Sequence, residues 1–372
     1  MKLYKNCRII TCADKDFENG YILTDNGKIS GIGDMKDMPE CENALDLKGK
    51  TVCPGFVDAH SHIGLFHDSE SYDMADANES TDAVTPHLRA IDGINPLDRC
   101  FREALLSGVT TVAAGPGSAN PIGGTFAVLK TAGKRIDDMV INSSAAMKFA
   151  FGENPKKCHG KGGSAPKTRM ATAAVIREAL FKAKNYDGTS FDMKCEALKP
   201  VVDGKMLVKA HAHRADDIFT AIRIAKEFGL CMTIEHCTDG ALIADELKKE
   251  NVAVILGPLM GDRGKPELCN KSYETARALY KAGLSFALMS DHPEVTESDL
   301  LMQAQLLVKH GVPGKEALYA ITINAAKAIG AEDRVGTLED GKDADFCVFT
   351  GDPLSFDGKI NFVVCSGVEY RA

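Results

Sequence analysis

Between residues 54 and 335, short apolar runs alternate with amphipathic segments of helical length. The runs are GFVDAH, VTTVAAG, AAMKFAFG, MLVKAHAH, CMTIEH, VAVILGP and LSFALMSDH, and a further strand is expected within TFAVLKTAG. The expected helices cover residues 97–107, 168–184, 215–228, 240–250, 271–282, 298–310 and 314–329. Continuously apolar strands connected by helices are typical of a parallel sheet that is buried on both faces. Seven or eight such units in about 280 residues predict an α/β fold, a (β/α)8 TIM barrel, in preference to an open sheet.

The two ends of the chain are both rich in short strand-like segments. Near the start stand CRIIT and GYILTDNGKISGIG, and near the end stand ADFCVFTG and NFVVCSGVEY. The tripeptide DNG at 25–27, between alternating segments, is a strong hairpin signal. Neither end is long enough to form a stable sheet alone. We therefore predict one small β-sandwich domain built from residues 1–53 plus 336–372, with the barrel in residues 54–335.

Charge and cysteine content exclude some classes of partner. The 372 residues carry a formal net charge of −8 and no Lys/Arg-rich run, which argues against a nucleic-acid partner. No apolar run reaches the roughly 18–20 residues of a membrane span, and the opening MKLYKNCRII lacks the apolar core of a secretory signal. The twelve cysteines show no paired spacing, which favours reduced thiols. We expect a cytoplasmic protein that binds neither nucleic acid nor membrane.

Five residues of metal-binding types fall at the ends of predicted strands. These residues are His60, His62, His211, His236 and Asp291. The carboxyl ends of barrel strands are where enzymes of this architecture place their chemistry. Imidazole nitrogens and a carboxylate suit Zn²⁺ or a similar divalent ion. A single histidine at such a place is usually a hydrogen-bonded core residue, but five matching positions together indicate a metal site.

These motifs resemble a known family. PGFVDAHSH, the single histidines on two later strands, the late SDH, and the closing ITINAAKAIGAEDRVGTLEDGKDADFCVF are similar to the amidohydrolase superfamily of metal-dependent hydrolases, from about residue 20 onward. Within it, the motifs look closest to the imidazolonepropionase-related and prolidase-like branch. The resemblance implies one or two divalent ions per chain, Zn first, with Fe, Mn or Ni as alternatives. It also implies that His60 and His62 bind one ion and His211 and His236 the other, while Asp291 binds metal and shuttles a proton.

The ligand from the fourth strand has two candidates. In one branch of the superfamily a carbamylated lysine joins two ions, and Lys148 is then the matching residue; another branch uses a glutamate, which matches Glu153. Strand alternation turns Lys148 into the barrel. A bare ammonium there would be costly to bury, so it needs carbamylation or a carboxylate partner. A simple ion pair between Lys148 and Glu153 is the alternative without a functional role.

The resemblance implies hydrolysis of a carbon–nitrogen bond by a metal-activated water. We expect a small-molecule amide substrate, such as an N-acyl amino acid, a dipeptide or a cyclic amide. Deamination of a small heterocycle uses the same chemistry and is the second hypothesis. The deaminases of the superfamily, like imidazolonepropionase, carry a glutamate three residues after the fifth-strand histidine, where this chain has Arg214. A catalytically silent scaffold of the same fold is a third, remote hypothesis.

Four further residues are candidates for binding the substrate. Arg214 and His213 suit a substrate carboxylate, because a guanidinium grips a carboxylate through two hydrogen bonds. The alternative is that Arg214 pairs with Asp216 or Asp217 at a helix start. His159 lies on a predicted loop above the site, and His292 follows the proposed catalytic aspartate. Barrels of this kind often pair, so a homo-oligomer is expected.

Overall fold

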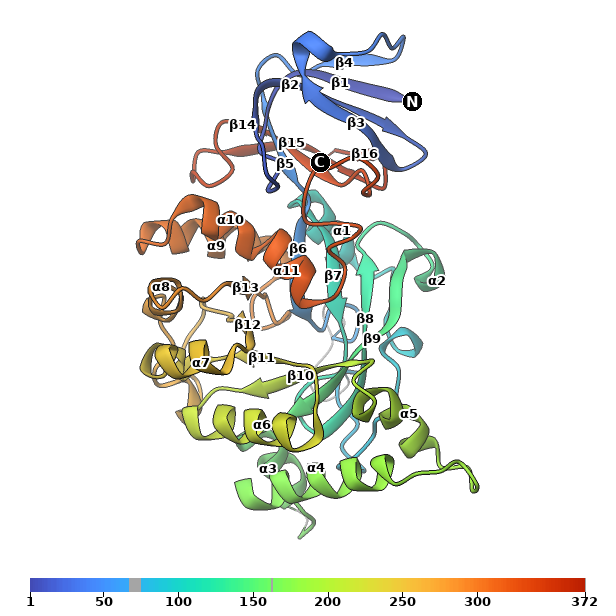
Figure 1. Cartoon of the computed structure of the whole chain (residues 1–372), viewed down its shortest axis with the longest axis vertical. Coiled ribbons are helices and arrows are strands. Elements are labelled where there is room, and N and C mark those ends of the chain that lie inside the picture. Colours follow the sequence, from blue (N-terminus) through green and yellow to red (C-terminus); the bar gives the residue numbers. More distant parts are fainter. Residues whose placement is uncertain (67–74, 162, 372) are drawn as a thin grey trace.

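A barrel forms the larger part of the computed structural model, which describes residues 1–66, 75–161 and 163–371 (Figure 1). Eight strands of the described residues hydrogen-bond to one another in chain order. They are β6 (Phe56–Ser61), β7 (Val109–Ala114), β8 (Ile122–Lys130), β9 (Val140–Ala150), β10 (Leu207–Ala212), β11 (Met232–His236), β12 (Ala253–Leu256) and β13 (Phe286–Leu288). The predicted barrel is thereby confirmed, and every apolar run named above overlaps one of its strands.

One strand of the barrel runs against the others. β8 lies where TFAVLKTAG predicts the third strand, but it pairs antiparallel with both β7 and β9. The other strand pairs of the barrel are parallel. The reason is the length of the connections, since a parallel pair needs a crossover of a dozen or more residues. Residues 115–121 and 131–139 are too short for that, and they hold only the single-turn helix α2 (Ile136–Met139).

Backbone and carboxylate contacts join the first and last barrel strands at their carboxyl ends. The N–H of Asp291 donates to the carbonyl of His60 at 3.0 Å, and the N–H of His62 donates to that of His292 at 3.1 Å. The buried carboxylate of Asp58 also accepts the N–H groups of His60 and Ser290, both at 3.0 Å. These contacts bring the segment after β13 beside the two histidines at the end of β6, His60 within the strand and His62 just after it.

Helices surround the barrel strands (Figure 1). The longer ones are α1 (Arg99–Leu106), α3 (Glu153–Gly160), α4 (Arg169–Lys184), α5 (Met193–Val202), α6 (Ala215–Phe228), α7 (Ala244–Glu250), α8 (Glu274–Lys281), α9 (Leu300–Lys309), α10 (Gly314–Ala320) and α11 (Ile323–Ala328). The predicted α6 has the observed bounds, whereas the predicted helix 314–329 is interrupted between α10 and α11. The sequence reading missed α3 and α5. Several helices begin at a side-chain cap, as where Asp98 accepts the N–H of Cys100.

Strands from both ends of the chain form a second sheet of eight strands within the described residues. They are β1 (Lys2–Ile9), β2 (Phe17–Asp25), β3 (Lys28–Asp34), β4 (Ala44–Asp46), β5 (Thr51–Pro54), β14 (Phe346–Thr350), β15 (Lys359–Cys365) and β16 (Val368–Tyr370). β14 pairs antiparallel with β5, which unites the two ends. The sheet curves strongly: two strands separate β1 from β15, yet the rings of Tyr4 and Phe362 lie 6.3 Å apart. A flat sheet would place such strands about 14 Å apart.

The hairpin between β2 and β3 turns at Asn26 and Gly27, as the DNG signal predicts. Both residues have positive φ, 47° and 78°, the backbone that a two-residue hairpin turn requires. The terminal sheet thus follows from local sequence signals. The boundaries of the two domains, at residues 53 and 336, stay a prediction.

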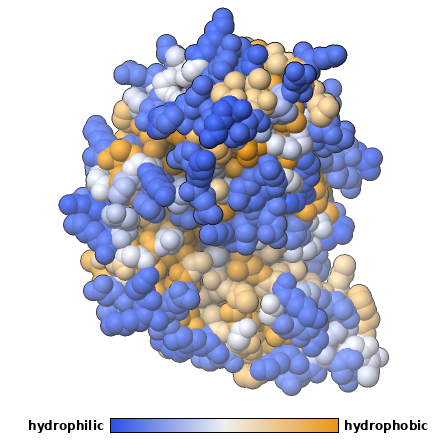
Figure 2. All heavy atoms as spheres, turned by 45° about the horizontal axis from the view of Figure 1, so that its top comes forward, coloured by the Kyte–Doolittle hydropathy of each residue, from blue (hydrophilic) through white to orange (hydrophobic). Residues whose placement is uncertain are grey.

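Three further features concern the molecular surface, the cysteine side chains and the hydropathy of the helices. Hydrophilic side chains cover most of the face in Figure 2, with apolar ones interspersed. All twelve cysteines are free. Among the described residues, no helix combines the length and the hydropathy needed to cross a bilayer.

Candidate active site

The predicted ligand residues come together at the carboxyl end of the barrel. His60 lies within β6 and His62 just after it, Lys148 lies in β9, His211 in β10, His236 at the end of β11, and Asp291 after β13. Two of these residues have an unfavourable backbone conformation, with φ of 73° at His236 and 53° at Asp291. Non-glycine residues rarely adopt positive φ, and such strain is concentrated at functional sites.

His60, His62 and Asp291 form the first ligand group. One ligand atom of each lies within 4.8 Å of those of the other two. The Nε2 atoms of His62 and His60 lie 3.2 and 3.6 Å from Asp291 Oδ1. Two imidazoles and one carboxylate are a donor set that suits a divalent transition-metal ion.

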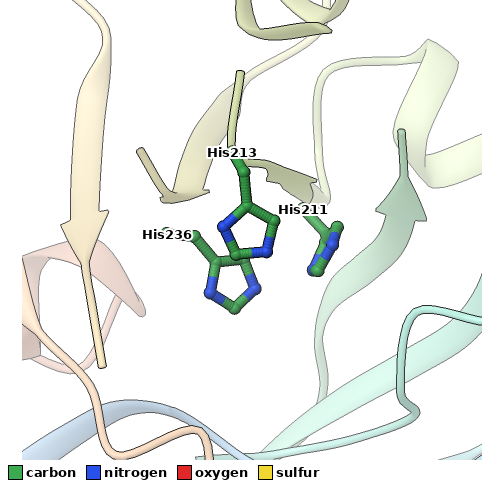
Figure 3. Close-up of side chains that lie close together, drawn as sticks. All are labelled: His211, His213 and His236. Carbon is green, nitrogen blue, oxygen red and sulfur yellow. The ribbon is translucent and has the colours of Figure 1, made fainter. Parts of the chain in front are cut away.

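The second ligand group is drawn in Figure 3. It consists of His211 in β10, His213 just after β10, and His236 at the end of β11. The rings of His213 and His236 stack with centroids 4.3 Å apart, and the ring of His211 meets both nearly at right angles. The Nε2 atoms of all three are buried and have no hydrogen-bond partner in the described structure. His213, which we expected to contact substrate, therefore joins the two predicted ligands.

The second ring nitrogen of four histidines is held by a hydrogen bond. His62 Nδ1 donates to Gly115 O at 2.6 Å, and His236 Nδ1 donates to Gly257 O at 2.8 Å. His60 Nδ1 bonds Glu235 at 2.7 Å, and His213 Nδ1 bonds the hydroxyl of Thr238 at 2.8 Å. The carbonyl and carboxylate partners fix the tautomer and leave the Nε2 lone pair for a metal, and the hydroxyl of Thr238 accepts from Nδ1 in the same tautomer of His213.

Burial keeps four of these imidazoles neutral, as metal binding requires. Burial lowers the pKa of His60, His211 and His213 well below the usual value, and it lowers that of His236 to about 3. Burial alone would raise the pKa of Asp291, but the neighbouring His236 and His62 outweigh it and bring this pKa to about 2. The nitrogen atoms of these four imidazoles are therefore neutral and the carboxylate of Asp291 is ionised, which fits a divalent cation.

Lys148 lies against the first group, and Glu153 does not. The Nζ of Lys148, fully buried, is 3.0 Å from His60 Nε2, and burial lowers its pKa to about 8. Glu153 begins α3, and its carboxylate pairs with Lys157 at 3.3 Å instead of with Lys148. Among the described residues, Glu153 belongs to neither ligand group.

Two buried charges behind the site were missed by the sequence reading. Lys209 Nζ lies 3.0 Å from Glu235 Oε2 and donates to the carbonyl of Ala59 at 2.9 Å. Glu235 in turn accepts a hydrogen bond from His60 Nδ1, so the Lys209–Glu235 pair orients this candidate ligand. A charged residue inside each of the apolar runs MLVKAHAH and CMTIEH was the available signal. Another buried acid, Glu267, places its Oε1 atom 3.8 Å from His213 Nε2.

A cavity of about 570 Å³ opens over the ligands. His62, His211 and Asp291 line it, together with three lysines, Lys157, Lys161 and Lys265, and the acid Glu294. This volume lies within the range of sites for small molecules. The cavity therefore gives a small substrate access to both ligand groups.

The other candidate substrate residues lie outside this cavity's described lining. Arg214 is half exposed and forms two 2.9 Å hydrogen bonds with Asp216, the pairing that was the alternative. His159 is buried, with Nε2 2.8 Å from Asn120 Oδ1. His292 is buried, and its backbone N–H donates to Ser290 Oγ at 3.1 Å. A substrate role for these three remains a prediction without a contact to support it.

Comparison with known proteins places the chain in a family. Residues 51–369 match the sequence profile of the amidohydrolase family. A solved structure of an amidohydrolase from Thermotoga maritima MSB8 is 41% identical, with a TM-score of 0.96 and full coverage of both chains. An imidazolonepropionase from Caldanaerobacter subterraneus subsp. tengcongensis is 27% identical over 92% of this chain and 86% of that protein.

A further relative is longer than this chain. Amidohydrolase tasK from Hapsidospora irregularis is 28% identical over 90% of this chain, but the match spans only 38% of that protein. The profile match covers most of the sequence, and the full-length structural match includes the barrel and the terminal sheet. The chain therefore belongs to the amidohydrolase family, hydrolases that act on carbon–nitrogen bonds.

Proposed function

We propose that this protein is a metal-dependent hydrolase that cleaves a carbon–nitrogen bond, an amide or peptide-like bond, of a small molecule. The observation that carries the proposal is the convergence of two ligand groups at one end of the barrel, beneath one cavity. His60, His62 and Asp291 hold one divalent ion, and His211 and His236 hold the other. Lys148, once carbamylated, is proposed to join them, in preference to Glu153.

Zinc is the proposed ion, with Fe, Mn or Ni as alternatives, because neutral imidazoles dominate the donor set. Such an ion supplies Lewis acidity, which activates water and polarises a carbonyl. Lys148 is suited to carbamylation because CO₂ reacts with a neutral amine, and its lowered pKa of about 8 leaves a much larger neutral fraction near pH 7 than the ordinary lysine value of 10.5 does. The carbamate forms as the amine nitrogen bonds the carbon of CO₂ and releases a proton.

Asp291 is the proposed proton shuttle. Its pKa of about 2 keeps the carboxylate ionised at neutral pH, ready to accept a proton from the attacking water. Asp291 also lines the cavity, so its carboxyl group can deliver the proton to the leaving nitrogen. Glu235 keeps the His60 ring in place during this transfer through the 2.7 Å hydrogen bond to Nδ1.

The charge of the cavity wall favours a substrate with a carboxylate. Among the described lining residues, Lys157, Lys161 and Lys265 contribute three positive charges, and Glu294 is the one acid beyond the ligands. Lys265 Nζ lies 3.5 Å from Glu267 and 3.4 Å from Asn154, so neighbours hold it at the wall. Among the candidate substrates, we therefore propose an N-acyl amino acid or a dipeptide in preference to a neutral cyclic amide.

Replacing Lys265 tests this preference. We expect Lys265→Met to raise KM for an N-acyl amino acid about tenfold, the value of one charged hydrogen bond, and to leave KM for the corresponding neutral amide unchanged. Lys281→Met, an exposed lysine at the end of α8, is the matched control. Equal effects of Lys265→Met on both substrates would refute the carboxylate preference.

The function itself is tested with metal-stripped protein reloaded with Zn²⁺. We expect turnover of N-acyl amino acids or dipeptides that yields one amine and one carboxylic acid for each bond cleaved. Ammonia release from a heterocycle without an acid product would favour the deaminase instead. A cytoplasmic location, in keeping with the free cysteines, and assembly into a homo-oligomer remain predictions.

A further inference from the structure

We propose that His213 is a third protein ligand of the cation held by His211 and His236, so that three imidazoles surround this ion. The inference rests on the proposed function, because it assumes that a divalent cation binds in the second ligand group. It changes the role of His213 from substrate contact to metal ligand.

The local sequence places two histidines on one side of the chain. HAH at 211–213 repeats the spacing of HSH at 60–62, and residues two apart on an extended segment point to the same side. The centroids of the His211 and His213 rings lie 4.7 Å apart, and the ring of His213 stacks on that of His236. The three side chains point toward one another in Figure 3.

The distances fit a shared cation. The candidate ligand atoms of the three residues lie within 4.8 Å of one another. Nitrogen ligands about 2.0–2.1 Å from a tetrahedral Zn²⁺ lie roughly 3.4 Å apart. Side-chain shifts of less than about 1 Å would therefore complete the site.

The buried nitrogen atoms need a partner. His213 is 4% exposed, and its Nε2, like those of His211 and His236, is without a hydrogen bond in the described structure. A buried polar atom without a partner costs about 1–3 kcal/mol. One cation would satisfy all three nitrogen atoms. His211 lines the cavity, whereas His213 is not among the described lining residues, so the cluster offers His213 a metal more directly than a substrate.

Thr238 orients the ring of His213 for this role. Its hydroxyl lies 2.8 Å from Nδ1, the ring nitrogen other than the unpartnered Nε2. Two other candidate ligands are also held through Nδ1, His62 by Gly115 O and His236 by Gly257 O. His213 therefore has the support typical of a metal ligand.

A competing explanation is an ion pair of His213 with Glu267. The 3.8 Å between His213 Nε2 and Glu267 Oε1 is too long for a hydrogen bond, and both atoms are without a hydrogen-bond partner among the described residues. An ion pair alone would thus leave two buried polar atoms unsatisfied. A cation at the three histidines would satisfy His213, and the nearby carboxylate would offset part of the cation's charge.

The test is metal binding, measured apart from activity. Apo-protein is titrated with Zn²⁺ in competition with a chromophoric chelator, and bound metal per chain is determined by mass spectrometry. We expect His213→Ala to lose one bound equivalent or to bind it at least tenfold more weakly. His310→Ala, an exposed histidine that stacks on Tyr273 outside the site, is the control that should bind as the wild type does.

A second variant keeps the ring and removes only its support. Thr238→Val should weaken the same binding event tenfold to a hundredfold, and circular dichroism checks that both variants are folded. Wild-type affinity in folded His213→Ala, or unchanged affinity in Thr238→Val should His213→Ala fail to fold, would overturn the proposal while leaving the proposed function intact. Wild-type protein that binds no Zn²⁺ would overturn both.

Discussion

Single side chains at the barrel end carry the proposed chemistry, and position in the sequence predicted most of them. His60, His62, His211 and Asp291 were found because each lies at or just beyond the carboxyl end of an apolar run. The supports Lys209 and Glu235 were not found, because their roles depend on the register between strands. That register sets Lys209 opposite Lys148 and His211 opposite Glu235, and periodicity along one strand does not reveal it.

Asp291→Asn tests the assignment of the proton shuttle. The amide cannot accept the proton, so we expect kcat to fall by about 10²–10⁴-fold. Steady-state kinetics with the metal-loaded enzyme measures this, and circular dichroism checks the fold. A variant with at least a tenth of the wild-type kcat would show that another group moves the proton.

At the scale of elements, the barrel was predictable and its inverted strand was not. Apolar runs identify buried strands, but they carry no information about direction, which the short connections around β8 determine. The short connection into the inverted strand contributes to the site, because Gly115, the first residue after β7, supplies the carbonyl that holds His62. It also places Phe126 of β8 with its ring 5.0 Å from that of His60 and 5.5 Å from Lys148 Nζ.

Gly115→Ala tests this close packing between β7 and β8. A Cβ at Gly115 would lie 2.2 Å from Phe126 Cδ2, so the ring against His60 must move. We expect a loss of about 1–3 kcal/mol in the free energy of unfolding and weaker Zn²⁺ binding. Urea denaturation and chelator competition measure the two effects.

Gly31→Ala in β3 is the matched control, because its Cβ would meet neighbours only at 3.7 Å. Its stability and its metal binding should match the wild type. Gly115→Ala that behaves like this control would show that the ring position does not matter for the ligands.

Across the whole molecule, an ion cluster around the buried Asp343 ties the barrel to the terminal sheet. Asp343, before β14, pairs with Lys130 of β8 at 2.8 Å, with Lys28 of β3 at 2.5 Å and with Arg334 at 2.8 Å. Lys130 also pairs with Asp345. The sequence predicted that the two ends share a domain, but it could not predict this cluster, because its members come together only once both sheets have formed.

The cluster predicts a pH dependence of stability. Burial alone would raise the pKa of Asp343, but Lys130 and its other cationic neighbours outweigh it and hold this pKa at about 2, below the ordinary value of 3.8. Its contribution should be fully present above about pH 4 and should be lost as the pH falls toward 2. Asp343→Asn should remove about 3 kcal/mol at pH 7, since it takes one partner from buried Lys130.

Urea denaturation at pH 7 and at pH 3 measures both effects. The stability difference between wild type and Asp343→Asn should be smaller at pH 3. Asp340→Asn, an exposed neighbour, is the control and should behave as the wild type at both values. A difference that stays constant with pH would contradict the role of the ionised carboxylate.

The central claim is that the two ligand groups bind divalent cations at the carboxyl end of the barrel. Anomalous X-ray diffraction at the zinc edge, from crystals of the Zn²⁺-loaded protein, tests it most directly. We expect one peak within about 2.3 Å of ligand atoms of His60, His62 and Asp291, and another within the same distance of ligand atoms of His211 and His236. Fully loaded crystals without an anomalous peak at either group would contradict it.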